Sequence, residues 1–136
     1  MHSADILYPM FGLVGLTFVV LLQIPIARFR AAFAGKVTAD DFRLGESSDV
    51  PEPVRLPNRN YMNLLEVPML FYVAGLMFYV TGKVDGVTLT LAWVYVALRA
   101  IHSAIHLTYN RVIHRLAPFA LSNFVLTAIW ALFFLR

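Results

Sequence analysis

Residues 59–81 read RNYMNLLEVPMLFYVAGLMFYVT, and this stretch decides the fold. It exceeds the roughly 20 residues that a helix needs to cross the hydrocarbon core of a bilayer. Its two charged residues, Arg59 and Glu66, lie in its N-terminal part. Three other stretches have a similar length and an equally apolar composition. We therefore predict an all-α integral membrane protein, a four-helix bundle with spans at about residues 6–27, 59–81, 87–109 and 118–135.

The composition supports this class. Of the 136 residues, 60% are hydrophobic and 14% are charged, whereas a soluble domain carries about 25% charged residues. We expect one transmembrane domain over residues 1–136, with a polar loop at 31–58. The chain has no cysteine, so a thiol involved in its chemistry must come from a ligand. The net charge of +3 is small, and the basic residues lie at membrane edges, so we expect no nucleic-acid partner.

The distribution of basic residues predicts the orientation, because cytoplasmic loops carry an excess of Lys and Arg. Only Lys83 and Arg136 lie on the side of the termini. The first and third connections should therefore be cytoplasmic, with both termini outside. These connections and their flanks hold the following basic residues: Arg28, Arg30, Lys36, Arg43, Arg55, Arg59, Arg111 and Arg115.

Two spans carry polar residues at helical spacing, three or four residues apart, so that each set shares one helix face. The two sets are Arg59, Asn63 and Glu66, and Arg99, His102, His106 and Tyr109. An ionisable side chain at the centre of a span costs about 2.5 to 3.5 kcal/mol on insertion scales. We therefore expect both stripes to face the bundle interior or a ligand, and Glu66 to pair with Arg99 across the bundle.

These residues alone leave several interpretations open. A Glu66 to Arg99 ion pair with Asn63 and His102 nearby could simply lock the second helix to the third, since structural ion-pair networks resemble functional ones. His102 and His106, four residues apart, could instead form a two-histidine, one-carboxylate metal site with Glu66. A haem held by two histidines is disfavoured, because the candidates all belong to the third span or its exit.

Two motifs carry a resemblance to a known family: Arg59-x-x-x-Asn63-x-x-Glu66 followed by Pro68, and Arg99-x-x-His102 followed by Arg115. The first resembles the second-helix signature of the MAPEG superfamily, the membrane-associated proteins in eicosanoid and glutathione metabolism. The second resembles the signature on the third helix of that superfamily. The number, order and spacing of the spans agree over nearly the whole chain. The chain is most similar to the prokaryotic branch.

The resemblance implies a homotrimer in a bacterial inner membrane, with glutathione as cosubstrate in clefts between subunits. It implies a glutathione-dependent transferase or peroxidase that acts on lipophilic electrophiles from the bilayer. Arg115 would be catalytic, because a guanidinium near the sulfur favours the thiolate. No metal is implied. The implied cofactor-binding residues are Arg28, Arg30, Arg59, Asn63, Glu66, Arg99, His102 and His106.

Some positions depart from the family pattern. Arg55 stands where several relatives carry an acid, and His106 and Phe119 stand at tyrosine positions. These changes remove contacts that glutathione would use. The alternative function is therefore a non-catalytic membrane accessory or interaction protein that keeps the fold, since a fold does not guarantee the chemistry of its family.

Overall fold

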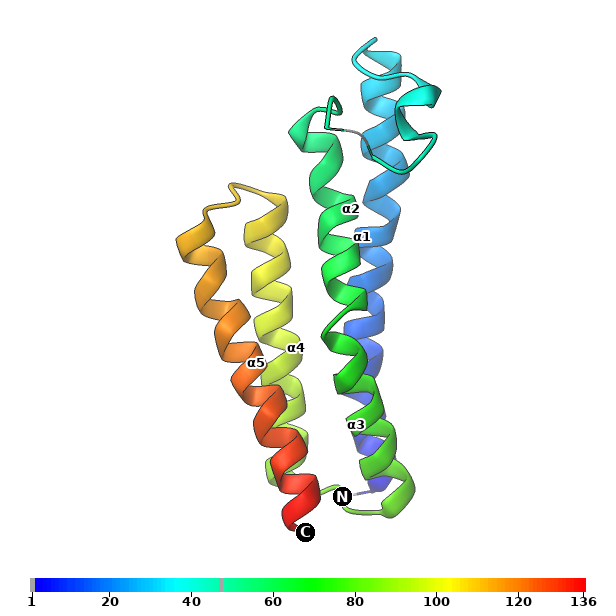
Figure 1. The fold of residues 1–136 in the computed structure, drawn as a ribbon. Coiled ribbons are helices and arrows are strands. Elements are labelled where there is room, and N and C mark those ends of the chain that lie inside the picture. Colours follow the sequence, from blue (N-terminus) through cyan, green and yellow to red (C-terminus); the bar gives the residue numbers. More distant parts are fainter. Residues whose placement is uncertain (1, 47) are drawn as a thin grey trace.

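The computed structural model describes residues 2–46 and 48–136. Within them, four helical segments are long and apolar enough to cross a membrane: Ser3–Phe33, Glu52–Thr81, Gly86–Leu107 and Val112–Leu135. These segments confirm the predicted helical membrane bundle (Figure 1). The elements in chain order are η1 (Ser3–Ile6), α1 (Leu7–Phe33), η2 (Ala39–Phe42), α2 (Glu52–Leu65), α3 (Pro68–Thr81), α4 (Gly86–Leu107) and α5 (Val112–Leu135).

The first two helices extend beyond the spans expected from the sequence. α1 continues to Phe33, and α2 begins at Glu52 rather than near Arg59, so the connection is shorter than the predicted loop at 31–58. Proline explains the difference at α2, because Pro53 lies in the first turn, where backbone N–H groups have no partner within the helix. Prolines that indicate a loop in the sequence are here part of a helix start.

The second span is not one continuous helix. α2 ends at Leu65, α3 begins at Pro68, and Glu66 between them has a non-helical backbone (φ −82°, ψ −95°). Pro68 has no N–H to donate to the Leu64 carbonyl, and its ring would collide with that carbonyl in a regular helix. Pro68 therefore interrupts the helix at Glu66, the last residue of the motif.

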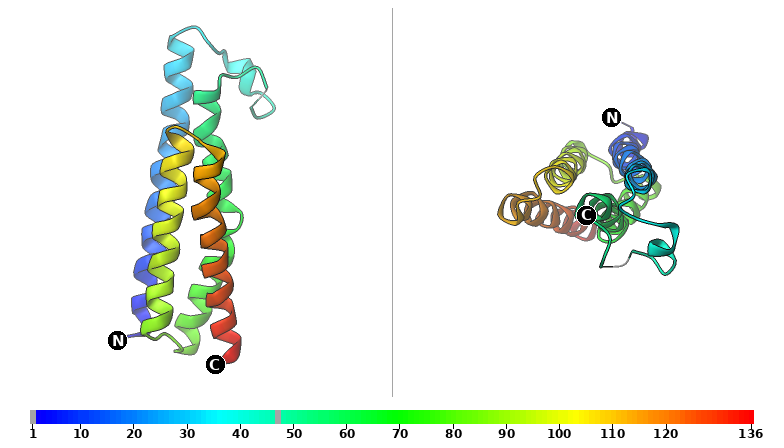
Figure 2. Two further views of the ribbon diagram at one scale, coloured as in Figure 1. Left: turned by 90° about the vertical axis from the view of Figure 1, so that its left-hand side faces the viewer. Right: turned by 90° about the horizontal axis from the view of Figure 1, so that it is seen from above.

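The helices run roughly parallel to one long axis, with the two termini at the same end (Figure 1). α1 lies beside α2 and α3, while α4 and α5 form a hairpin that packs against them. At the opposite end, α1 and α2 reach further than α4 and α5, and the connection that contains η2 lies there (Figure 2). The loop end of the bundle is therefore uneven.

The core occupies the half of the bundle near the termini. The Phe71 ring stacks on Tyr95 with centroids 4.7 Å apart, and the Phe78 ring meets Phe133 edge to face at 5.2 Å. Leu13 of α1 is fully buried in the same cluster. Apolar packing on three sides fixes α4, which carries the polar stripe toward the other end.

Candidate functional site

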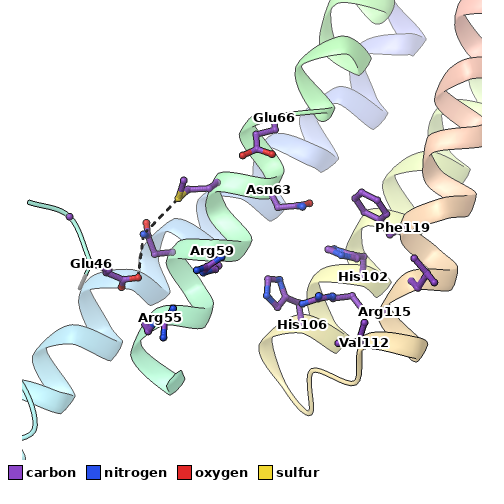
Figure 3. Close-up of a pocket in the computed structure, with 14 residues that line it drawn as sticks. Glu46, Arg55, Arg59, Asn63, Glu66, His102, His106, Val112, Arg115 and Phe119 are labelled. Atoms are coloured by element: carbon purple, nitrogen blue, oxygen red, sulfur yellow. Dashed lines mark hydrogen bonds between the residues drawn. The ribbon is translucent and has the colours of Figure 1, made fainter. Parts of the chain in front are cut away.

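A cavity of about 780 Å³ opens at the loop end of the bundle, between α2 on one side and α4 and α5 on the other. Figure 3 shows its side chains converging from these helices. The part of the loop at residues 45–46 closes one edge. The lining residues are Gly45, Glu46, Arg55, Asn58, Arg59, Met62, Asn63, Glu66, His102, His106, Val112, Arg115, Leu116 and Phe119.

The α2 wall is polar because the predicted stripe faces the cavity. Arg59, Asn63 and Glu66 line it, and Arg55 continues the stripe one turn toward the N-terminus of α2. Asn63 points across to α4 and α5, whereas Glu66 lies next to the break between α2 and α3 (Figure 3). Arg59 and Glu66 are exposed in the single chain and thus accessible to a ligand.

The opposite wall combines two histidines with an arginine. The His102 and His106 rings lie 5.9 Å apart, and His102 lies 5.6 Å from the Phe119 ring. Arg115 projects from α5 toward His106 (Figure 3). Its Nη1 donates a hydrogen bond to Asn110 Oδ1 at 2.8 Å. A guanidinium is thus held at the cavity wall by the turn between α4 and α5.

Arg99 lies behind this wall, and its partner differs from the predicted one. It is fully buried, its Nη2 donates to Asn63 Oδ1, and its Cζ lies 5.8 Å from the centroid of the Phe119 ring. Within residues 2–46 and 48–136, Glu66 forms no ion pair with Arg99 or with another basic group. The expected pair was wrong because Asn63 on the same stripe meets Arg99 instead, while Glu66 lies at the break between α2 and α3.

A second buried contact fixes α2 against α4. Asn60 and Ser103 exchange hydrogen bonds: Asn60 Nδ2 donates to the Ser103 carbonyl at 3.2 Å, and Ser103 Oγ donates to Asn60 Oδ1 at 3.0 Å. Both side chains are almost completely buried. This reciprocal pair, together with the contact from Arg99 to Asn63, holds the two helices at a fixed separation along the cavity.

The structure places Arg28 and Arg30 away from this lining. The Arg28 guanidinium forms an ion pair with Glu46 at 3.5 Å and lies 4.4 Å above the Phe42 ring. Arg30 borders a smaller cavity of about 410 Å³ between α1, α2 and the end of α4, together with Glu52. Within one chain, Arg28 therefore reaches the main cavity only through Glu46.

The metal interpretation finds no support in the geometry. In the part of the chain that the structure describes, no three histidine, cysteine or acidic side chains come together as metal ligands. His102 and His106 are neighbours, but Glu66 does not join them. The buried Nδ1 atoms of both histidines have no hydrogen-bond partner among the described residues.

Several lining residues were not predicted from the sequence. Asn58 and Met62 continue the α2 stripe, so the helical period extended backwards from Glu66 would have found them. Val112 and Leu116 lie on the α5 face that carries Arg115, but apolar residues in a span give no signal for a cavity. Glu46 comes from the loop, and only the fold brings it to the cavity.

The lining carries more positive than negative charge. It contains three arginines, Arg55, Arg59 and Arg115, and two acids, Glu46 and Glu66. Guanidinium groups bind carboxylates in a bidentate manner, and a carboxylate binds an ammonium group. The cavity therefore suits a small ligand with more than one anionic group and an amine.

Searches of curated proteins and of solved structures give no match. The sequence profile of the MAPEG family matches residues 6–135, nearly the whole chain. Together with the apolar helices, this match identifies an integral membrane protein. The predicted resemblance is confirmed, and the chain belongs to the MAPEG family.

Proposed function

We propose that this protein is a glutathione-dependent transferase or peroxidase that acts on lipophilic electrophiles. The observation that carries the proposal is the cavity of about 780 Å³ that combines three arginines and two acids with an apolar α5 face. Glutathione has two carboxylates, one ammonium group and a thiol, and each group has a complementary side chain in this lining. Family membership supports the same ligand.

The α2 wall would hold the charged backbone of glutathione. Arg59 would bind a carboxylate, Glu66 the ammonium group, and Asn63 a peptide group. His102 and His106 would border the tripeptide from α4. Glu66 has no basic partner among the described residues and is exposed, so it is available for a ligand amine. Arg99 would act mainly by fixing Asn63, to which it already donates.

Arg115 would stabilise the thiolate, which is the reactive form of the cosubstrate. In a transfer reaction the thiolate sulfur forms a bond to the electrophilic carbon, and the leaving group departs with the electron pair of its bond. In a peroxidase reaction two glutathione thiols are oxidised to a disulfide while a hydroperoxide is reduced to an alcohol and water. Both reactions begin with the same thiolate.

The apolar face of α5 suggests where the second substrate would lie. Val112 and Leu116 are exposed in the single chain, beside Arg115 on the same helix. A substrate that enters from the bilayer would pack against these side chains and present its electrophilic atom near the arginine. This arrangement would keep the lipophilic and polar substrates on opposite walls.

The proposal includes a homotrimer in a bacterial inner membrane, with both termini outside the cytoplasm. In that assembly Arg28 or Arg30 of a neighbouring subunit would approach the cavity, with α1 and α2 of neighbouring subunits close together. Native mass spectrometry in mild detergent tests it. A trimer is expected, and exclusively monomeric protein would count against the shared site.

A non-catalytic accessory role is the second candidate. The buried contacts of Asn60 with Ser103 and of Arg99 with Asn63 hold the bundle together without a ligand. Such a protein would need these contacts but would not need Arg59 and Arg115 at an open cavity. Measurements on Arg59 and Arg115 therefore separate the candidates.

The test is calorimetric titration of glutathione into detergent-solubilised protein, combined with conjugation rates for a panel of lipophilic electrophiles. Arg115→Ala should lower kcat about a hundredfold with little loss of glutathione affinity, because its contact strengthens as the thiolate reacts. Arg59→Ala should instead raise the Kd about tenfold, the effect of one lost charged hydrogen bond.

Arg111→Ala is the matched control, because this arginine lies just before α5, four residues ahead of Arg115, but does not line the cavity. It should leave both the rate and the affinity unchanged. A wild-type protein that neither binds glutathione nor gains thermal stability from it would refute the catalytic proposal, since a ligand that binds the native state raises its melting temperature.

A further inference from the structure

Arg115 has a defined side-chain partner that the family motif does not contain. Its Nη1 atom donates to Asn110 Oδ1 at 2.8 Å, across the turn between α4 and α5. Among the described residues this is the hydrogen bond that orients the Arg115 guanidinium, since its other donors have no protein partner. A guanidinium has five donors, so one contact leaves four for a ligand.

Asn110 itself is held in an unusual conformation. Its backbone is left-handed, with φ at +48°. Among the described residues it is the one non-glycine residue with a positive φ. Its N–H donates to the Ile105 carbonyl at 2.8 Å, which closes the end of α4. Asparagine tolerates this conformation better than most residues do. The side-chain amide is therefore directed by a turn that is itself hydrogen-bonded to α4.

A fixed acceptor matters because a free arginine side chain samples many rotamers. An arginine side chain loses most of its rotamer entropy when it is fully ordered. An arginine that is already oriented at the cavity wall needs less ordering when the thiolate forms, and a small misplacement of a reacting group lowers rates steeply. The amide oxygen must face the guanidinium, because the amide NH₂ cannot accept a hydrogen bond.

We infer that Asn110 is a positioning residue that sets the Arg115 guanidinium at the wall of the cavity for reaction with a bound thiolate. This inference rests on the proposed function. Asn110 does not line the cavity. It acts through Arg115 alone, so its loss should affect the chemical step and not the binding of the tripeptide.

The test substitutes Asn110→Gly, because glycine adopts the left-handed conformation without strain and removes only the acceptor. The expected result is a kcat at least about tenfold lower, with a weaker ultraviolet absorbance of the bound thiolate. The Kd for glutathione and the melting temperature should stay at their wild-type values. A merely structural role would lower the melting temperature together with the rate.

Tyr109→Phe is the control, since it removes the Tyr109 to His114 hydrogen bond of 3.2 Å in the same turn without touching Arg115. It should leave kcat unchanged. If Arg115→Ala abolishes turnover while Asn110→Gly is fully active, the inference is wrong and the proposed function stands. If Arg115→Ala is itself silent, the proposed function fails and the inference fails with it.

Discussion

Replacing Asn60 by alanine tests whether the buried hydrogen bonds between α2 and α4 hold the bundle at the cavity. Asn60 is fully buried, and its two hydrogen bonds with Ser103 are 3.2 and 3.0 Å long. Hydrogen bonds between membrane helices contribute about 0.6 kcal/mol each, and at most roughly 1.7. Two of them give about 1.2 kcal/mol, to which the unsatisfied Ser103 hydroxyl adds roughly 1 kcal/mol.

We therefore expect Asn60→Ala to lower the free energy of unfolding by about 2 kcal/mol. The assay is equilibrium unfolding of the detergent-solubilised protein in mixed micelles with increasing denaturing detergent. The double variant with Ser103→Ala should cost less than the sum of the two single variants, by about 1 kcal/mol of coupling. The second substitution removes the hydroxyl that the first leaves without a partner.

Asn58→Ala is the matched control. Its longer contacts, to Glu46 at 3.4 Å and to Met62 at 3.9 Å, lie nearer the surface. The cost should stay within about 0.5 kcal/mol, as for most surface substitutions. If Asn60→Ala is no more destabilising than this control, or if its effect simply adds to that of Ser103→Ala, the buried pair does not hold the helices as argued.

Three further substitutions test other parts of the structure. Pro68→Ala should raise the melting temperature, because the helix regains a backbone hydrogen bond. It should also weaken glutathione binding, because Glu66 would become part of a regular helix. An unchanged affinity for glutathione would contradict the role of the break between α2 and α3. The hydrogen bond from the Thr88 N–H lowers the pKa of the Asp85 carboxyl in the folded protein. The ionised carboxylate therefore stabilises the fold at pH values above the pKa of Asp85 in the unfolded chain. This stabilisation is lost as the pH falls through the pKa of Asp85 in the folded protein. Asp85→Asn should remove this acid-dependent loss in melting curves at several pH values, and an unchanged pH profile would refute it. Gly82→Ala should cost about 1 kcal/mol in unfolding experiments, because φ is +67° at the end of α3, and a neutral result would show that the turn adapts.

The presence of four apolar helices could be predicted because hydropathy over a span is a local property. The polar stripe of α2 followed from helical spacing for the same reason. Helix starts were harder, since Pro53 indicates a loop in sequence but is also favoured in a first helical turn. The helix itself therefore begins at Glu52, before the predicted span at 59–81.

The predicted pairing of Glu66 with Arg99 was wrong because it assumed a straight helix through Pro68. Pro68 was visible in the sequence, but its effect on the side-chain direction of Glu66 appears only when the backbone is traced. Asn110 illustrates the same limit at the other wall of the cavity. Its contact with Arg115 depends on a left-handed backbone conformation that the sequence permits but does not require.

The uneven packing of the bundle has a mechanical consequence for the cavity. α2 packs against α1, α3 and α4, whereas α5 packs against α4 and α3, so the two facing walls are joined through α4 and the closed end. Few buried contacts resist a change in the distance between such walls, and regions of low contact density deform at low cost. The distance between α2 and α5 is thus less constrained than the distance between α2 and α4, which the buried contacts of Asn60 with Ser103 and of Arg99 with Asn63 fix. A change in the width of the cavity would therefore come from α5, while Arg55 and Arg59 keep their spacing along α2.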